Sequence, residues 1–371
     1  MWIQSITMRE IRLPLREPFR ISSGVVSERR ILLLELTDAN GASVWSECVA
    51  GEFPNYSPET IDTAWHAIKE WLAPRVLHHE IADVRAVYDM LQEDLRGHEM
   101  AKAALEMGCW ALESERRQVS LAELLGGVHE VIPVGISLGI QSEPALLVER
   151  ARAAADDGYR KIKLKIKPGA DLEYVAAVRE ALPDAHLMAD ANNAYTLADA
   201  DRLAELDAFD LMMIEQPLDR EDLVRHAELQ RRLRTPICMD ESITSLARAE
   251  DMVALGSGRI VNIKPGRVGG FTSSIAIHDL CARHGIPVWC GGMLESGVGR
   301  AYNVALASLP NFTLPGDLSP SARYWERDIV DPEWTMAADG TARVPFDVPG
   351  IGVTVNRDRI DNLTVRSGKL A

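Results

Sequence analysis

The chain has 371 residues, 47% of them apolar, and a formal net charge of −15. Its length suits a barrel of about 250 residues joined to a smaller domain, and its apolar content supports a large core and excludes a disordered chain. The acidic balance excludes a typical nucleic-acid-binding surface, and no apolar run approaches the roughly 18 residues of a membrane span.

An N-terminal α+β capping domain is predicted for residues 1–125, because strand patterns are followed there by helical patterns. The strands expected for its antiparallel sheet span residues 2–15, 30–37 and 43–49, with a hairpin turn at 38–41. The helices expected after them lie near residues 58–75, 83–95 and 98–117. Two loops rich in turn-forming residues, 17–27 and 50–57, are candidates for lids over a site.

From residue 131 onward, short apolar strands alternate with amphipathic helices, which indicates parallel βα units. The expected strands span residues 131–140, 161–166, 186–190, 211–215, 236–240, 259–264 and 287–293, with a candidate eighth at 311–314. This number predicts an α/β protein with a modified (β/α)7β TIM barrel at residues 126–319. An open doubly wound sheet is the alternative, but no glycine fingerprint follows the first strand. The C-terminal tail, 320–371, is expected to pack back on the capping domain.

Five ionisable residues end successive predicted barrel strands: Lys165, Asp190, Glu215, Asp240 and Lys264. They are separated by 25, 25, 25 and 24 residues, which is about one βα unit each. The carboxyl ends of barrel strands surround one mouth, where the active sites of this fold lie. A single acid after a strand is more often a helix cap, but five ionisable residues in this order and phase predict a shared site.

Three carboxylates on neighbouring strands would repel one another unless a cation neutralised them. Oxygen ligands indicate a hard metal ion. We therefore expect Asp190, Glu215 and Asp240 to bind Mg²⁺, for which Mn²⁺ can substitute.

The lysines on either side of these acids predict proton transfer. A lysine beside a dication and a second lysine has its ammonium form disfavoured, so the pKa of Lys165 is expected to fall into the range of a base. Lys163 faces the same side of the strand and is assigned to lower that pKa and to hold substrate; Lys161 is given no role. If Lys165 and Lys264 both exchange protons next to a carboxylate, the centre racemises. If one lysine removes the proton and then protonates a leaving group on the same face, the result is elimination.

Segments across nearly the whole barrel resemble one known family. They are KIKLKIKPG (161–169), DANNAYTL (190–197), IEQPL (214–218), CMDESI (238–243), IVNIKPGRVGG (260–270), PVWCGGMLESGVGR (287–300) and NVALASLPNFTLPGD (303–317), with EPFRISSG (17–24) and MAKAALEM (100–107) in the N-terminal domain. They resemble the enolase superfamily, and within its muconate lactonizing enzyme subgroup the branch of o-succinylbenzoate synthases and N-succinylamino acid racemases.

The resemblance implies that Asp190, Glu215 and Asp240 bind Mg²⁺ and that Lys165 and Lys264 are the acid/base pair. It implies racemisation of N-succinylamino acids (N-acylamino acids), synthesis of o-succinylbenzoate by dehydration in menaquinone biosynthesis, or both. In this branch an arginine at the position of Arg267 goes with racemase activity; a surface arginine is the alternative.

Other activities of the family are kept as alternatives. Mandelate-racemase-like members carry a His/Asp pair where this chain has Lys264, which disfavours acid-sugar dehydration. Dipeptide epimerases usually carry Asp-x-Asp after the seventh strand, where this chain has GGMLES (291–296), so dipeptide epimerisation is a less favoured alternative. Muconate cycloisomerisation, and a barrel that binds a metal–metabolite complex without catalysis, are the remaining alternatives.

Seven further residues are candidates for substrate binding: Ser137, Asn192, Gly292, Met293, Glu295, Phe19 and Arg20. Ser137 ends the first barrel strand, and Asn192 follows a proposed metal ligand by two residues; an Asx turn is the alternative for Asn192. The glycines around Met293 would let backbone amides reach a substrate carboxylate. Phe19 and Arg20, with Tyr56 on the second loop, are candidates for a lid; a solvated loop is the alternative for Arg20.

The expected partner is a small-molecule carboxylate, with no nucleic acid and no membrane, and such barrels commonly form homo-oligomers, either dimers or octamers. The N-terminus has no signal-peptide pattern, and the five cysteines show no CxxC spacing. We therefore expect a cytoplasmic protein with free thiols.

Overall fold

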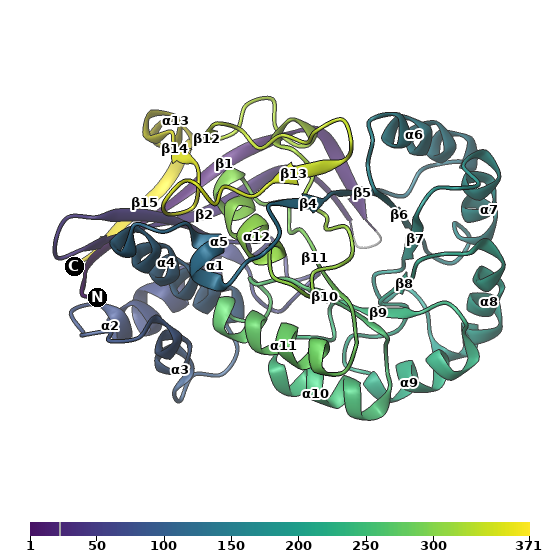
Figure 1. Cartoon of the computed structure of the whole chain (residues 1–371), viewed down its shortest axis with the longest axis horizontal. Coiled ribbons are helices and arrows are strands. Elements are labelled where there is room, and N and C mark those ends of the chain that lie inside the picture. Colours follow the sequence, from purple (N-terminus) through teal and green to yellow (C-terminus); the bar gives the residue numbers. More distant parts are fainter. Residues whose placement is uncertain (22–23) are drawn as a thin grey trace.

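The computed structural model describes residues 1–21 and 24–371, apart from the side chains of residues 19–25. It consists of an α+β part built from the two ends of the chain and a ring of strands and helices built from its middle (Figure 1). The ring holds a parallel seven-stranded sheet, and the α+β part holds an antiparallel four-stranded sheet. This is the α/β architecture that the sequence predicts.

The antiparallel sheet has the strand order β15–β1–β2–β3. Its strands are β1 (Ile3–Ile21), β2 (Gly24–Asp38), β3 (Ser43–Cys48) and β15 (Thr364–Leu370). The predicted hairpin turn is confirmed, because the carboxylate of Asp38 accepts hydrogen bonds from the N–H groups of Asn40 and Ala42 at 2.8 and 2.9 Å. β15 comes from the C-terminal tail and pairs with β1.

The loop predicted at residues 17–27 is wrong in part. β1 continues to Ile21 and β2 begins at Gly24, so only residues outside the described part separate the two strands. After a register shift between Pro14 and Phe19, strand pairing resumes at Phe19, which lies opposite Val26. The β-branched residues of this stretch favour an extended backbone, so the hairpin is longer than the alternating pattern of residues 2–15 indicates.

Helix α4 (Glu99–Arg117) packs against β2 and β3. The carboxylate of Glu59 caps its first turn, accepting hydrogen bonds from the N–H groups of Met100 and Ala101 at 2.8 Å. A Cβ at Gly108 would lie 2.8 Å from the side chain of Leu36, so this glycine sets how closely the helix approaches the sheet. The other helices here are α1 (Ile61–Ala67), η1 (Ile68–Leu72), α2 (Ala73–Val76), η2 (Val84–Ala86), α3 (Val87–Gln92) and α5 (Leu121–Leu125).

The parallel sheet contains seven strands in sequential order, so each βα unit returns to the strand next to the one before it. They are β5 (Gly135–Leu138), β6 (Lys161–Lys165), β7 (Leu187–Asp190), β8 (Ile214–Glu215), β9 (Ile237–Met239), β10 (Ile260–Ile263) and β11 (Val288–Cys290). All seven lie within strands predicted from the sequence.

Two details differ from the predicted barrel. Residues 131–140 do not form one strand, because β4 (Val131–Pro133) pairs antiparallel with β13 (Thr341–Arg343) before β5 begins. In the described chain, the candidate eighth strand at 311–314 is reduced to isolated contacts. Phe312 and Gly316 make single parallel bridges to Val288 and Val134, which link β11 to the start of β5.

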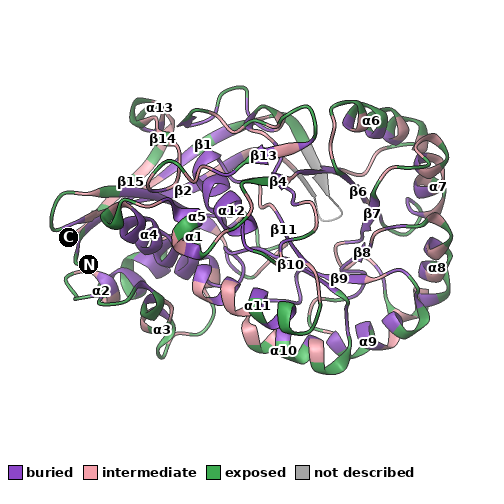
Figure 2. Ribbon diagram, in the orientation of Figure 1, coloured by how far each residue is buried: buried purple, intermediate pink, exposed green. Residues whose placement is uncertain are grey.

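The helices between the strands form the outer wall of the ring (Figure 1). They are α6 (Pro144–Asp156), α7 (Leu172–Ala181), η3 (Leu197–Asp199), α8 (Ala200–Glu205), η4 (Leu206–Phe209), α9 (Leu223–Arg232), α10 (Leu246–Leu255), α11 (Phe271–Arg283) and α12 (Gly297–Ala307). Helices α6 to α10 are exposed on their outer side and buried toward the strands, as Figure 2 shows, whereas α12 is buried throughout and lies against β3 and α5. The C-terminal tail adds η5 (Ser321–Arg323), β12 (Val330–Asp331), β14 (Thr354–Val355) and α13 (Arg357–Leu363).

Two buried glutamates of the N-terminal part cap helices of the barrel. Glu47 on β3 accepts hydrogen bonds from the N–H groups of Ser296 and Gly299, at 3.2 and 3.0 Å, at the start of α12. Glu106 on α4 accepts the N–H groups of Phe271 and Thr272, at 2.8 and 2.9 Å, at the start of α11. Each carboxylate satisfies backbone donors that the barrel helix itself leaves unpaired.

Replacing Glu47 with Gln is expected to change how stability depends on pH. Burial, and then the charge of Glu295, raises the pKa of Glu47 from 4.5 to about 8. Between these values the folded state keeps a proton that the unfolded state has lost, so the wild-type side chain makes stability fall as the pH rises. Between pH 6 and 8.5, the unfolding free energy of the variant should fall by about 2–3 kcal/mol less than that of the unmodified chain, as measured by urea unfolding.

The exposed Glu180→Gln serves as the control for this experiment, because it makes the same substitution on the surface of α7, away from both caps. Equal pH dependence in Glu47→Gln and the unmodified chain would contradict the raised pKa.

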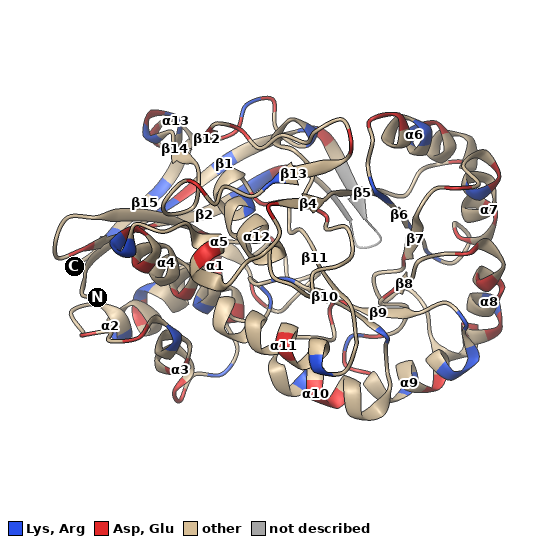
Figure 3. Cartoon of the chain, viewed as in Figure 1, with Lys and Arg blue, Asp and Glu red and all other residues tan. Residues whose placement is uncertain are grey.

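Along the outer helices, Lys and Arg positions are interspersed with Asp and Glu positions (Figure 3). Among the described residues, every helix is too short or too polar to cross a lipid bilayer. All five cysteines are buried free thiols, as the absence of a paired spacing predicts.

Candidate active site

The five strand-end residues lie side by side. In the parallel ladder Lys165 is opposite Asp190, and Asp190 is opposite Glu215. Asp240 directly follows β9, and Lys264 directly follows β10. Adjacent strands are about 4.8 Å apart, so these five side chains share one end of the sheet. The three carboxylates are at most 1% exposed.

Each lysine contacts the carboxylates directly. Lys165 donates a hydrogen bond to Asp190 Oδ2 at 2.6 Å, and Lys264 donates one to Asp240 Oδ2 at 2.9 Å. Lys163 lies 3.1 Å from Glu215 Oε2 and 3.3 Å from Asp190 Oδ2. The acids are therefore flanked by amines on two sides, from β6 and from the end of β10.

The three carboxylates fit a divalent cation by their chemistry. Burial, and then the charge of Asp190, raises the pKa of Glu215 to about 8, which is the repulsion that a cation between the acids would relieve. All the donors are oxygens, the ligands that Mg²⁺ prefers. Within the described residues, no three acidic, His or Cys side chains form a ready metal cluster, since ammonium groups lie between the acids.

The lowered pKa of Lys165 beside a dication stays a prediction, whereas the pKa values of Lys163 and Lys264 are raised. Burial alone would lower the pKa of Lys163, but Asp317, Glu215 and Asp190 outweigh it and raise the pKa. Burial is likewise outweighed at Lys264, whose pKa is raised chiefly by Asp240. The reason is that carboxylates, and not cations, are the nearest charged neighbours of both amines.

Asp317 is a site residue that the sequence reasoning missed. It lies 2.5 Å from Lys163 Nζ and 3.2 Å from Lys161 Nζ, and its side chain is buried. Burial raises its pKa, but the two lysines outweigh this effect and hold the pKa below its usual value. The sequence offers one weak signal, because Asp317 follows the candidate eighth strand, 311–314, by three residues.

Tyr56 reaches the barrel mouth from the N-terminal loop. Its hydroxyl donates a hydrogen bond to Asp240 Oδ1 at 3.2 Å and accepts one from Lys264 Nζ at 3.1 Å. Burial, followed by the charge of Asp240, raises the pKa of Tyr56 to about 12, so the phenol stays protonated at neutral pH. The predicted lid residue therefore contacts both an acid and an amine of the site.

Arg267 is buried, so the alternative of a surface arginine is wrong. Its guanidinium pairs with Asp240 and donates to the hydroxyl of Tyr56 at 3.1 Å. It also donates to the carbonyl groups of Ile243 and Asn262 at 2.7 and 2.6 Å. Arg267 therefore orients the same carboxylate that Lys264 contacts.

Two predicted substrate-binding residues join this cluster. Asn192 accepts a hydrogen bond from Lys165 Nζ at 2.6 Å and donates one to Glu241 Oε1 at 3.0 Å. Ser137 lies opposite Lys163 in the ladder, and its buried hydroxyl has no hydrogen-bond partner among the described residues. An unpaired hydroxyl beside a lysine leaves one donor for a substrate group.

The predicted residues after β11 are placed differently. Glu295 is buried and accepts hydrogen bonds from the N–H of Met293 and from Asn303 Nδ2, both at 2.8 Å. Its carboxylate braces its own loop and is not brought to the lysines. Gly292 lies where a Cβ would approach the carbonyl oxygen of Asp317 at 2.9 Å. The side chains of Phe19 and Arg20 lie outside the described residues.

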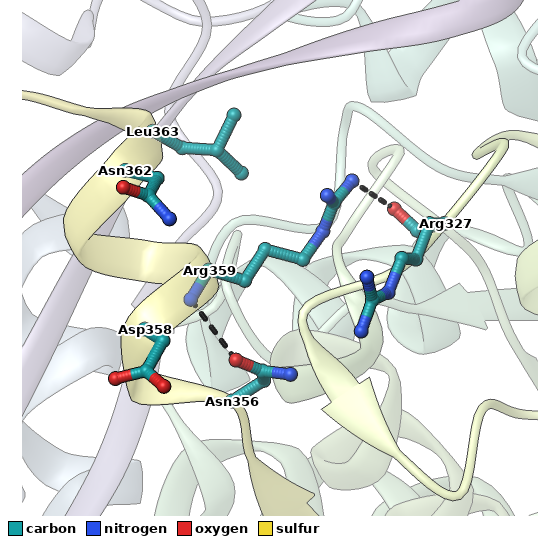
Figure 4. A pocket seen from close by; sticks show the side chains of 6 residues that line it. All are labelled: Arg327, Asn356, Asp358, Arg359, Asn362 and Leu363. Atoms are coloured by element: carbon teal, nitrogen blue, oxygen red, sulfur yellow. Dashed lines mark hydrogen bonds between the residues drawn. The ribbon is translucent and has the colours of Figure 1, made fainter.

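A cavity of about 500 Å³ adjoins Tyr56, Glu241 and Arg267 on the side of the N-terminal domain. A smaller pocket lies elsewhere, along α13, where Arg359 donates a hydrogen bond to the carbonyl of Arg327 at 2.6 Å (Figure 4). None of the five strand-end residues lines either pocket, and the larger cavity adjoins the site through Tyr56, Glu241 and Arg267.

Comparisons with known proteins agree with this geometry. Residues 146–359 match the family model described as enolase C-terminal domain-like, and residues 3–126 match the N-terminal domain of mandelate racemase and muconate lactonizing enzyme. An o-succinylbenzoate synthase of Geobacillus stearothermophilus is 48% identical over 98% of this chain and 96% of its own. An N-succinylamino acid racemase of Amycolatopsis sp is 47% identical over 98% of both chains.

A crystal structure of an enolase superfamily member from Listeria innocua superposes with a TM-score of 0.96 at 40% identity, covering 100% of this chain and 99% of that one. Family models thus match both parts of the chain, and relatives of high identity span nearly all of it. The chain is therefore an enzyme of the enolase superfamily, in its muconate lactonizing enzyme subgroup.

Proposed function

We propose that this enzyme removes the proton next to a carboxylate in N-succinylamino acids, which it racemises, or in the precursor of o-succinylbenzoate, which it dehydrates, or in both. The observation that carries the proposal is the pair of amines, Lys165 and Lys264, that flank three buried carboxylates from different strands. The relatives from Geobacillus and Amycolatopsis, at 48% and 47% identity, bear the names of these two activities, which further supports the proposal.

Asp190, Glu215 and Asp240 are the residues proposed to hold Mg²⁺, or Mn²⁺ in its place. A divalent cation bound there would supply positive charge to the substrate carboxylate as its neighbouring carbon loses a proton. Asn192 and Glu241 support one side of this set, and Arg267 and Tyr56 orient Asp240 on the other.

Lys165 is proposed to take the α-proton on one face of the substrate, and Lys163 to hold the substrate carboxylate from below. Racemisation follows when Lys264 delivers a proton to the opposite face. Elimination follows when Lys165 returns its proton to a departing hydroxyl group on its own face, while the ammonium of Lys264 stabilises the developing negative charge. Arg267 lies in the cluster, and in the branch that this chain resembles an arginine at this position goes with racemase activity, so racemisation is included in the proposal.

The proposal is tested by incubating the Mg²⁺-loaded enzyme with N-succinylphenylalanine in D₂O, and separately with the hydroxylated precursor of o-succinylbenzoate. We expect deuterium at the α-carbon with loss of optical rotation, or formation of o-succinylbenzoate. Absence of all three signals would contradict the proposed function and favour a barrel that binds its ligand without catalysis.

Replacing Lys264 with Ala should distinguish the role of Lys264 from that of Lys165. Racemisation is expected to disappear, while Lys165 still exchanges the α-proton of one enantiomer, because each lysine serves one face. Proton NMR in D₂O with each pure enantiomer measures this, and the exposed Lys69→Ala is the control. Equal loss of exchange for both enantiomers would refute the two-face assignment.

The remaining proposals concern organisation. Residues 1–125 and the tail 320–371 are proposed to form the capping unit, and 126–319 the catalytic barrel. We also propose that the enzyme works as a cytoplasmic homo-oligomer, a dimer or an octamer.

A further inference from the structure

Beneath the carboxylate trio lies a second group of buried charges, formed by Lys161, Lys163 and Asp317. Lys161 is fully buried, and its amine lies 3.2 Å from Asp317 Oδ1 and 3.5 Å from the centre of the Trp289 ring. A Cβ at Gly135 would lie 2.6 Å from Lys161 Cε, so this glycine makes room for the lysine stem. The arrangement places two ammonium groups below the site with one carboxylate between them.

Lys163 can pair with either of two acidic groups. One consists of the proposed metal ligands, Glu215 at 3.1 Å and Asp190 at 3.3 Å. The other is Asp317, at the shorter distance of 2.5 Å. An ammonium that pairs with the ligands competes with a cation for the same oxygens. The strength of its attachment to Asp317 therefore decides how much it competes.

Asp317 is held in place without help from the metal ligands. Its N–H donates to the carbonyl of Cys290 at 2.9 Å, and its carbonyl accepts from Arg300 Nη1 at 2.8 Å. Arg300 in turn lies 3.4 Å from Glu295 Oε2. This explains the buried Glu295, which was predicted to bind substrate: it braces the arginine that fixes the backbone of Asp317.

We propose that Asp317 is a positioning residue that draws the ammonium of Lys163 away from Asp190 and Glu215, so that these carboxylates stay free to bind a divalent cation. The ammonium of Lys161 pairs with the other carboxylate oxygen of Asp317, Oδ1. The inference rests on the proposed function, since it assumes that the acid trio is the metal site. It assigns to Asp317 an effect on metal affinity that does not require contact with the metal.

The test is a titration of the full-length protein with Mn²⁺ alone, without substrate, following free Mn²⁺ by electron paramagnetic resonance. Asp317→Asn is expected to bind Mn²⁺ about 10–100-fold more weakly than the unmodified chain, as is typical when a residue supporting metal ligands is lost. Asp317→Glu, which keeps the charge, should bind more tightly than Asp317→Asn. Adding Lys163→Met to Asp317→Asn should restore most of the affinity, because the competing ammonium is gone.

Asp328→Asn is the matched control. Asp328 is also buried and hydrogen-bonded, to the N–H of Gly297 at 2.9 Å and the hydroxyl of Ser321 at 2.6 Å, and these partners lie outside the strand-end cluster. Its replacement should lower the unfolding temperature without changing Mn²⁺ affinity. Unchanged affinity in Asp317→Asn, or equally weak binding in the double variant, would overturn the inference alone. No Mn²⁺ binding by the unmodified chain would overturn the proposed metal site as well.

Discussion

Turnover of Lys165→Ala is expected to fall by about 10²–10⁴-fold, for racemisation and elimination alike, because elimination begins with proton removal by this amine and racemisation needs both amines. Exchange of the α-proton with D₂O, followed by NMR for both enantiomers, measures the loss. The fold should persist, since the side chain lies at the open end of the sheet and retains some exposure.

Lys167→Ala is the matched control for this variant. Lys167 lies two residues further along the same chain, is exposed, and takes no part in the strand-end cluster. Its replacement should leave turnover unchanged. Exchange of the α-proton at the unmodified rate in Lys165→Ala would show that Lys165 does not remove this proton.

Replacing Asp240 with Asn is expected to abolish turnover and divalent-cation binding together, and to destabilise the protein. Asp240 pairs with Lys264 and with Arg267, and it accepts a hydrogen bond from Tyr56. Removing its charge leaves two buried cations without their partner, which typically costs about 3–5 kcal/mol of unfolding free energy. Calorimetric Mg²⁺ titration, turnover and urea unfolding measure the three effects.

The control for Asp240→Asn is Asp251→Asn, an exposed acid on α10 that lies 3.9 Å from a guanidinium nitrogen of Arg248. It should change none of the three quantities. Retained Mg²⁺ affinity in Asp240→Asn would show that the cation binds elsewhere.

The strand-end cluster was the part of the site most open to prediction. Its residues recur once per βα unit, so a single periodicity along the chain indicates that they meet at one end of the sheet. Their side chains need no further information to converge, because the parallel ladder places Lys165, Asp190 and Glu215 on neighbouring strands in register.

The supporting residues could not be predicted in the same way. Tyr56 and Glu47 come from the N-terminal domain, and no local pattern says which barrel residue a loop or sheet of another domain will touch. Asp317 follows a segment that forms isolated bridges and no strand among the described residues. Its position along the chain therefore did not show that it lies with the other acids. The contact of Glu295 with Arg300 was also out of reach, because an acid in a glycine-rich loop gives no sign of the arginine that it braces.

The pairing of β15 with β1 ties the first and last strands of the chain into one sheet. During translation β1 leaves the ribosome several hundred residues before its partner, so the edge of the nascent sheet stays open while the barrel is being made. A single cut in the chain therefore cannot release the two domains as intact pieces. A circular permutant with its new ends in a loop on the outside of the barrel would join β15 directly to β1 along the chain. Such a permutant would change the order of synthesis without changing the sheet, so it would show whether the order of synthesis affects the order of folding.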